Sequence, residues 1–101
     1  MDIRIPKQFK IFGQTYKIKL DKKLTAKDDH IGQTQSRFNL IIIQPNCEGV
    51  PRKQSQIEQV YLHEVVHVVF GQLSEYALRD NEALVDRVAS AFHQILTTSK
   101  Y

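Results

Sequence analysis

The stretch Leu62-His63-Glu64-Val65-Val66-His67 has the form H-E-x-x-H. On a helix, residues four apart lie about 40° apart around the axis and roughly 6 Å along it, so His63 and His67 can direct their imidazoles at one metal ion. Glu64 lies beside them, where a carboxylate can take a proton from a water that the metal polarises. The motif therefore predicts a helix with the chemistry of a zinc hydrolase. The alternative is a core helix that bears these residues by chance.

A second polar motif, Asn81-Glu82-Ala83-Leu84-Val85-Asp86, follows after a short connection. Glu82 and Asp86 share one face of a helix because they are four residues apart. A catalytic zinc takes three protein ligands and leaves a fourth position for water, so two packed helices would present Glu82 beside His63 and His67. Asp86, one turn further on, could accept the second ring N–H of a ligand histidine. The alternatives are an acid favoured by the helix dipole for Glu82 and a solvated charge for Asp86.

Together the two motifs resemble the gluzincin pattern of thermolysin-like metallopeptidases, H-E-x-x-H followed by N-E-x-x-S-D, with Val85 in place of the serine. The resemblance implies three zinc ligands, a general base and an outer partner for a ligand histidine, which are His63, His67 and Glu82, then Glu64, then Asp86. The small size and the preceding strands are also similar to the minimal zincin domains of phage and prophage metallopeptidases, including the ImmA/IrrE-like group. The motif match covers residues 62–86, with a looser likeness in strand order upstream.

These residues predict a selective zinc-dependent endopeptidase that hydrolyses a protein or peptide substrate with metal-activated water. The alternative is a zincin-fold binding module that keeps the metal and recognises a protein partner without cutting it. Zinc binding alone needs no general base, so Glu64 favours the peptidase. Hydrolysis also needs a donor that stabilises the oxyanion, and Tyr76, in the connection between the two helices, is the candidate for that role.

Upstream of the motif the sequence predicts β-strands. Residues 9–12 and 15–20 flank Gly13-Gln14, which is a β-hairpin pattern with glycine in the turn. Residues 31–35 can form a short strand, and the β-branched run over residues 40–44 predicts the clearest strand of the chain. The charged segment from residue 21 to 30 and the Gly- and Pro-punctuated segment from residue 47 to 54 are predicted to be loops.

Two helices are predicted downstream. Ser55-Gln56-Ile57-Glu58 has the form of a capping box and predicts where the motif helix begins, with Gly71 at or near its end. The helix is rich in β-branched valines, which weakly disfavour helix, but burial routinely overrides propensity. Asp80 is predicted to cap the last helix. The apolar stripe expected on that helix consists of Leu84, Val85, Val88, Phe92, Ile95 and Leu96.

The expected fold is therefore one α+β domain over residues 1–101, of the minimal zincin-like kind. A small antiparallel or mixed N-terminal sheet would pack on the active-site helix and the C-terminal helix. In such folds an edge strand beside the active-site helix binds an extended peptide by β-augmentation. Residues 40–44 would serve as that strand, unless their apolar character places them in the centre of the sheet.

The net charge of +3 is unevenly distributed along the chain. Residues 1–54 carry 11 Lys/Arg against 5 Asp/Glu, or +6, and residues 55–101 carry 3 against 6, or −3. A basic half can indicate a nucleic-acid or acidic partner. Here the lysines alternate with apolar residues, so a solvated strand face is favoured and a nucleic-acid partner is not.

The remaining candidates point to no second site. Cys47 is the only cysteine, so it forms no intrachain disulfide, and a spectator thiol is favoured over a zinc ligand that keeps the enzyme latent. His93 lies about 16 Å along the last helix from Glu82, which favours a structural or surface role, and His30 is interpreted as a polar loop residue. Residues 1–6 lack the apolar core of a signal peptide, and the longest apolar run is too short for a bilayer. A cytoplasmic protein without a membrane partner is expected, with its oligomeric state open.

Overall fold

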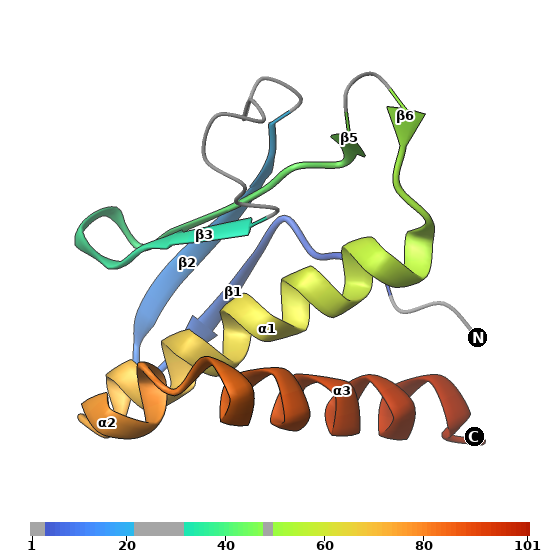
Figure 1. Cartoon of the computed structure of the whole chain (residues 1–101). Coiled ribbons are helices and arrows are strands. Elements are labelled where there is room, and N and C mark those ends of the chain that lie inside the picture. Colours follow the sequence, from blue (N-terminus) through green and yellow to red (C-terminus); the bar gives the residue numbers. More distant parts are fainter. Residues whose placement is uncertain (1–3, 22–31, 48–49) are drawn as a thin grey trace.

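In a computed structural model of the chain, residues 4–21, 32–47 and 50–101 are described. They form a four-stranded sheet with helix α1 packed against it, and α1 lies between this sheet and helix α3 (Figure 1). The predicted α+β class is confirmed, and the sheet is mixed. The loop predicted over residues 21–30, including His30, lies outside the described residues except for Asp21.

The sheet has the strand order β1-β2-β4-β3. Its strands are β1 (Gln8–Ile11), β2 (Gln14–Leu20), β3 (Gly32–Gln35) and β4 (Leu40–Ile43). β2 and β4 are parallel, whereas β1–β2 and β3–β4 are antiparallel. The predicted β1–β2 hairpin is confirmed, but its turn is Phe12-Gly13, with φ angles of 48° and 80°. Two consecutive positive φ values suit the right-handed twist of the flanking strands, and Gly13 adopts its value without strain.

The position of β4 decides which strand borders the functional site. Ile41 and Ile43 of β4 are fully buried, and β4 lies between β2 and β3. The edge-strand role considered for residues 40–44 is therefore wrong, and the alternative of a central, buried strand is confirmed. Among the described strands, β3 is the edge strand that lies beside α1.

The segment predicted as a loop after β4 contains a second, two-stranded sheet. β5 (Asn46–Cys47) pairs antiparallel with β6 (Val50–Pro51). Arg52 fastens this segment to the end of β4, because its Nε donates to the Gln44 carbonyl at 3.2 Å and its Nη2 to Gln44 Oε1 at 3.1 Å. A short 3-10 helix, η2 (Ser36–Phe38), connects β3 to β4.

α1 (Gln54–Gln72) begins one residue before the predicted capping box. Lys53 is the N-cap residue, and its backbone N–H donates to Gln56 Oε1 at 3.2 Å. The prediction that Ser55 and Glu58 form the box is wrong, since Glu58 is buried in the helix interface. Gly71 lies in the last turn of the helix, as predicted.

α1 buries two of its faces, which explains why its valines are compatible with a helix. One face packs on the sheet around Tyr16, Ile41, Ile43 and Val68, with Val60, Tyr61 and Val65 partly buried beside them. The opposite face packs on α3 through Leu62, Val66, Val85 and Ala89. Burial on both sides favours a helix that is apolar all round, and it outweighs the low helix propensity of the β-branched residues.

A short helix, α2 (Tyr76–Arg79), interrupts the connection to α3 (Glu82–Thr98). Asn81 caps α3 by accepting the Leu84 backbone N–H on its Oδ1 at 3.1 Å, so the prediction of Asp80 as the cap is wrong. The predicted apolar stripe is only partly correct. Val85 is buried, whereas Phe92, Ile95 and Leu96 are exposed. In the described part of the chain, no helix combines the length and apolar character needed to cross a membrane.

Candidate metal centre

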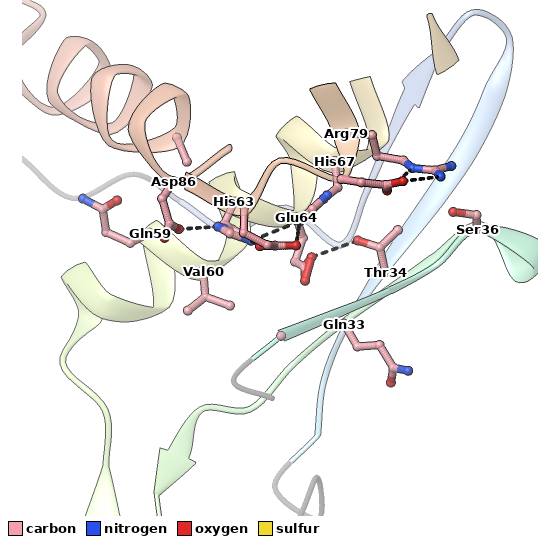
Figure 2. A pocket seen from close by; sticks show the side chains of 14 residues that line it. Gln33, Thr34, Ser36, Gln59, Val60, His63, Glu64, His67, Arg79 and Asp86 are labelled. Atoms are coloured by element: carbon pink, nitrogen blue, oxygen red, sulfur yellow. Dashed lines mark hydrogen bonds and ion pairs between the residues drawn. The ribbon is translucent and has the colours of Figure 1, made fainter. Parts of the chain in front are cut away.

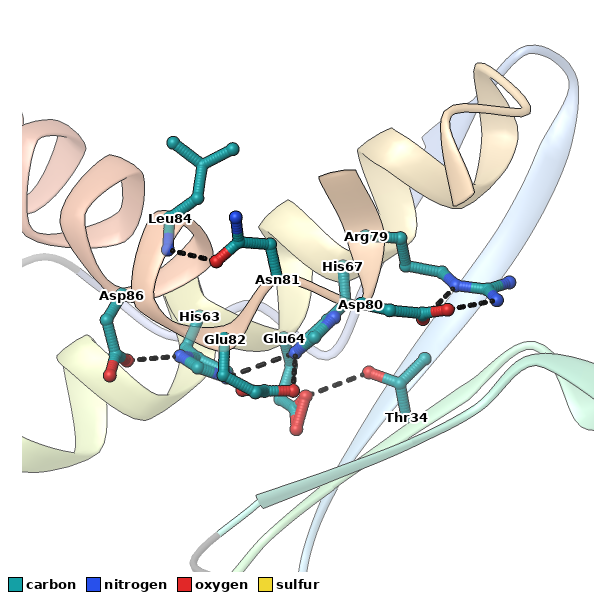
Figure 3. Close-up of polar contacts among 10 residues, drawn as sticks. All are labelled: Thr34, His63, Glu64, His67, Arg79, Asp80, Asn81, Glu82, Leu84 and Asp86. Carbon is teal, nitrogen blue, oxygen red and sulfur yellow. Dashed lines mark hydrogen bonds and ion pairs between the residues drawn. The ribbon is translucent and has the colours of Figure 1, made fainter. Parts of the chain in front are cut away.

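Three side chains from two helices converge on one point (Figure 3). His63 and His67 lie one turn apart on α1, and their Nε2 atoms are 3.1 Å apart. Glu82, the first residue of α3, lies with Oε2 2.9 Å from His63 Nε2 and Oε1 3.2 Å from His67 Nε2. One ligand atom from each residue lies within 4.8 Å of the others, so the group could hold a metal ion.

The spacing and donor types of this group are compatible with a metal ion. A metal with ligands at 2.0–2.1 Å in tetrahedral geometry separates neighbouring ligand atoms by about 3.3 Å. The two Nε2 atoms are 3.1 Å apart, and each lies close to a different oxygen of Glu82, at 2.9 Å from Oε2 for His63 and at 3.2 Å from Oε1 for His67. A cation between two imidazole nitrogens and a carboxylate oxygen would be attracted by all three, and without a cation a proton on one Nε2 atom can bridge these contacts. The three groups therefore could hold a metal ion.

Asp86 determines how His63 faces the other two groups. His63 Nδ1 lies 2.5 Å from Asp86 Oδ1. A carboxylate only accepts, so Nδ1–H is the donor, and in the neutral imidazole the lone pair is then on Nε2, toward Glu82 and His67. This is the contact that the sequence predicted for Asp86.

Glu64 lies beside the three converging groups but points to the other wall of the cleft. Its side chain is 6% exposed, and Thr34 Oγ1 of β3 donates to Glu64 Oε2 at 3.0 Å. Burial raises the pKa of Glu64, while the Thr34 hydrogen bond and the charges of His67 and His63 lower it, and Glu82 raises it further, with a net upward shift. A carboxyl group with a raised pKa holds a proton more readily than an exposed glutamate, as a proton-transferring residue requires.

A glycine allows β3 to approach α1 this closely. A Cβ placed on Gly32 would lie 2.5 Å from Val60 Cγ1 and 3.2 Å from Glu64 Cγ. Any larger residue would push the strand away from the helix. The close approach brings Thr34, two residues further along the strand, into hydrogen-bonding distance of Glu64.

The group formed by His63, His67 and Glu82 opens into a cleft of about 780 Å³ (Figure 2). β3 forms one wall, and the α2–α3 connection with the first turns of α3 forms the other. Among the described residues that line it, Arg79 is the only arginine or lysine. Its guanidinium is held in place by Asp80, through Nε–Oδ1 at 2.8 Å and Nη2–Oδ2 at 3.3 Å, and it lowers the pKa of that carboxyl.

Tyr76 does not line this cleft, so the geometry gives no support to its predicted role as oxyanion donor. Its exposed ring lies under the Arg79 guanidinium at 4.7 Å. His93 contacts Glu58 in the helix interface, far along α3 from Glu82, in agreement with a structural role. The structure thus brings His63, His67, Glu82, Glu64 and Asp86 together and leaves Tyr76 and His93 outside the cleft.

Thr34 and Arg79 are two polar residues of the site that the sequence analysis did not identify. Thr34 lies in a polar strand with no motif, and only the pairing of β3 with β4 turns it toward α1. For Arg79 a signal existed, since it directly precedes Asp80 and the second motif. Charged residues in a connection are normally solvated, so this signal was weak.

Comparison with protein-family models, with curated proteins and with solved structures found no significant match to this chain.

Proposed function

We propose that the protein is a zinc-dependent peptidase that hydrolyses an extended peptide bound in the cleft. The observation that supports this most strongly is the position of Glu64. It lies beside the group formed by His63, His67 and Glu82, yet it is not one of the three converging residues, and it is buried and oriented by Thr34. A metal site that serves only structure or binding has no use for such a carboxyl group.

Zinc is the metal that suits this donor set. Two imidazole nitrogens and one carboxylate oxygen are a common catalytic zinc combination, and they leave one position open to the cleft. A bound zinc ion would polarise the substrate carbonyl and increase the acidity of the attacking water. Without a metal, His63, His67 and Glu82 would need a shared proton to form a hydrogen-bonded cluster.

The residues of the chain then divide the proton transfers of peptide hydrolysis. Glu64 accepts a proton from the attacking water as the oxygen bonds to the carbonyl carbon. It returns that proton to the nitrogen as the carbon–nitrogen bond breaks, so the products are a carboxyl group and an amine. Thr34 keeps the Glu64 carboxyl in place through both transfers, and Asp86 keeps His63 in the tautomer that a metal requires.

β3 and Arg79 provide the means to hold a substrate. β3 is an edge strand whose residues Gly32, Gln33 and Thr34 line the cleft, and an edge strand can pair with an extended peptide through its free backbone groups. Arg79 keeps N–H groups beyond the two that contact Asp80. Those N–H groups can donate to the carbonyl oxygen of the substrate, a role for which the sequence offered only Tyr76.

The first test is metal content. Elemental analysis of the purified wild type should give near-stoichiometric zinc, and Glu82→Ala should lose most of it. Glu75→Ala, which removes an exposed acid of the α1–α2 connection, is the matched control and should keep the metal. Equal zinc in wild type and Glu82→Ala would show that Glu82 is not a ligand.

The second test is cleavage. Unfolded protein substrates and peptide mixtures should be cut by the zinc-loaded wild type, and a chelator should stop the reaction until zinc is restored. Glu64→Gln should retain zinc and lose cleavage. If the wild type binds zinc and peptides tightly but cuts none, the protein is a metal-containing binding module instead.

A further inference from the structure

A second histidine–carboxylate pair connects α1 to α3, away from the cleft. His93 Nε2 of α3 is hydrogen-bonded to Glu58 Oε1 of α1 at 2.8 Å. Glu58 is 1% exposed, and its other oxygen, Oε2, has no hydrogen-bond partner within the described ranges. A fully buried carboxyl group is costly to maintain, and replacing a buried charged pair with apolar residues is often neutral or stabilising. The pair therefore calls for an explanation other than stability.

The apolar contacts between the two helices do not define their relative axial position. They are made by aliphatic side chains, Leu62 and Val66 on α1 and Val85 and Ala89 on α3. Hydrophobic attraction is non-directional, and α1 is rich in valine along its length. A displacement of α3 by one helical turn, about 5.4 Å, would still bury apolar surface.

Without a bound metal, the polar contacts at the metal centre do not define the axial position of α3 on α1 either. The side chains of Glu82 and Asp86 are 67% and 72% exposed. Water can solvate both carboxylates after such a displacement, so losing their histidine partners costs little. Glu58 has no such option, because a displaced His93 would leave its carboxyl buried without a partner.

We propose that the Glu58–His93 pair sets the axial register of α3 on α1, and thereby places Glu82 and Asp86 opposite His67 and His63 before a metal binds. Antiparallel contacts run from this pair toward the cleft, first Gln59–Ser90 at 3.4 Å, then His63–Asp86, then His67–Glu82. A one-turn displacement at Glu58 would move Glu82 away from both histidines. Glu58 and His93 are thus positioning residues for the metal centre, and the inference rests on the metal site of the proposed function.

The test separates register from stability with the double variant Glu58→Leu/His93→Leu. Three quantities are measured: stability to urea without metal, zinc affinity by competition with a chelator, and the NMR contact between the His63 ring and Asp86 in the metal-free protein. We expect stability equal to or above that of the wild type, zinc affinity lowered by about 10-fold or more, and loss of the NMR contact. The matched control, Gln59→Ala/Ser90→Ala, removes the neighbouring exposed contact and should change none of the three.

A double variant that is stable and keeps both wild-type zinc affinity and the His63–Asp86 contact would overturn the proposal. If the double variant does not fold, Glu58→Gln decides. Its amide oxygen can still accept from His93, so zinc affinity should stay near that of the wild type, whereas Glu58→Leu alone should lower it. Equal losses in both single variants would overturn the proposal. If the wild type itself binds no zinc, the proposed function fails, and the metal-free NMR contact still tests the register.

Discussion

Histidine–carboxylate contacts join α1 to α3 at two places, and the carboxylates at these places have opposite environments. At the cleft, Glu82 and Asp86 are mostly exposed and meet His67 and His63. Away from the cleft, Glu58 is buried, and among the described residues its hydrogen-bond partner is His93. A solvated carboxylate can exchange its partner for a metal at little cost, whereas a buried one holds a single partner. The open pairs are suited to chemistry, and the closed pair is suited to defining structure.

The largest contrast should appear in folding stability. His93→Ala leaves the Glu58 carboxyl group buried without its partner, and removing one member of a buried pair in this way costs about 3–5 kcal/mol. Glu82→Ala, at the exposed end, should cost less than about 1 kcal/mol. Urea unfolding of both metal-free variants measures the difference. Similar losses in the two variants would show that the two pairings are energetically alike.

Substitutions in the exposed pairs should lower the metal affinity and leave the folding stability nearly unchanged. Asp86→Asn weakens the hydrogen bond that orients His63, and loss of such a contact lowers metal affinity by about 10–100-fold. Chelator competition gives the affinity, and Glu75→Gln serves as the control for removing one exposed negative charge. An unchanged affinity in Asp86→Asn would mean that the contact with His63 does not matter for metal binding.

Thr34→Val tests the opposite wall of the cleft at nearly constant side-chain volume. The Thr34 hydrogen bond lowers the pKa of Glu64, so its loss should raise that pKa further. The acid limb of kcat/KM should move to higher pH, and the rate on that limb should fall by up to about 10-fold. Gln33→Ala, an exposed neighbour on β3, should leave the pH profile unchanged. A Thr34→Val profile identical to that of the wild type would separate Thr34 from the function of Glu64.

The smallest effect is the pH dependence that Glu64 gives to folding in the metal-free protein. Burial raises the pKa of Glu64 above its ordinary value of 4.5, so the folded state binds the proton more tightly than the unfolded state. Its contribution to stability is fully present below pH 4.5 and is lost as the pH rises through the folded-state pKa. The stability of the wild type relative to Glu64→Gln should therefore fall as the pH rises above 4.5. A constant difference between the two proteins across this range would contradict the shift.

Much of the site was predictable because its parts are local. His63, Glu64 and His67 lie on one helix, and Glu82 and Asp86 on another, so helical periodicity alone sets each pair's spacing. The β1–β2 hairpin and the strand that became β4 were predictable for the same reason, since turn chemistry and β-branched runs act over a few residues.

The helix starts show how local patterns can mislead. Ser55 with Glu58 matches a capping box, but the long-range contact with His93 takes Glu58 into the interface, and Gln56 takes its place at the cap. Asp80 is a good N-cap residue, yet its contact with Arg79 leaves the role to Asn81. In both cases a competing partner that the local pattern does not include decided the outcome.

The sequence by itself determined which side chains can act together within one element, because helical and turn geometry depends only on adjacent residues. The tertiary structure decided the rest. It placed β3 rather than β4 at the edge of the sheet, it brought Thr34 to Glu64 and Arg79 to the cleft, and it buried Glu58 against His93. Each of these features depends on contacts between segments far apart in the chain. A local sequence pattern does not contain the free energy of such contacts.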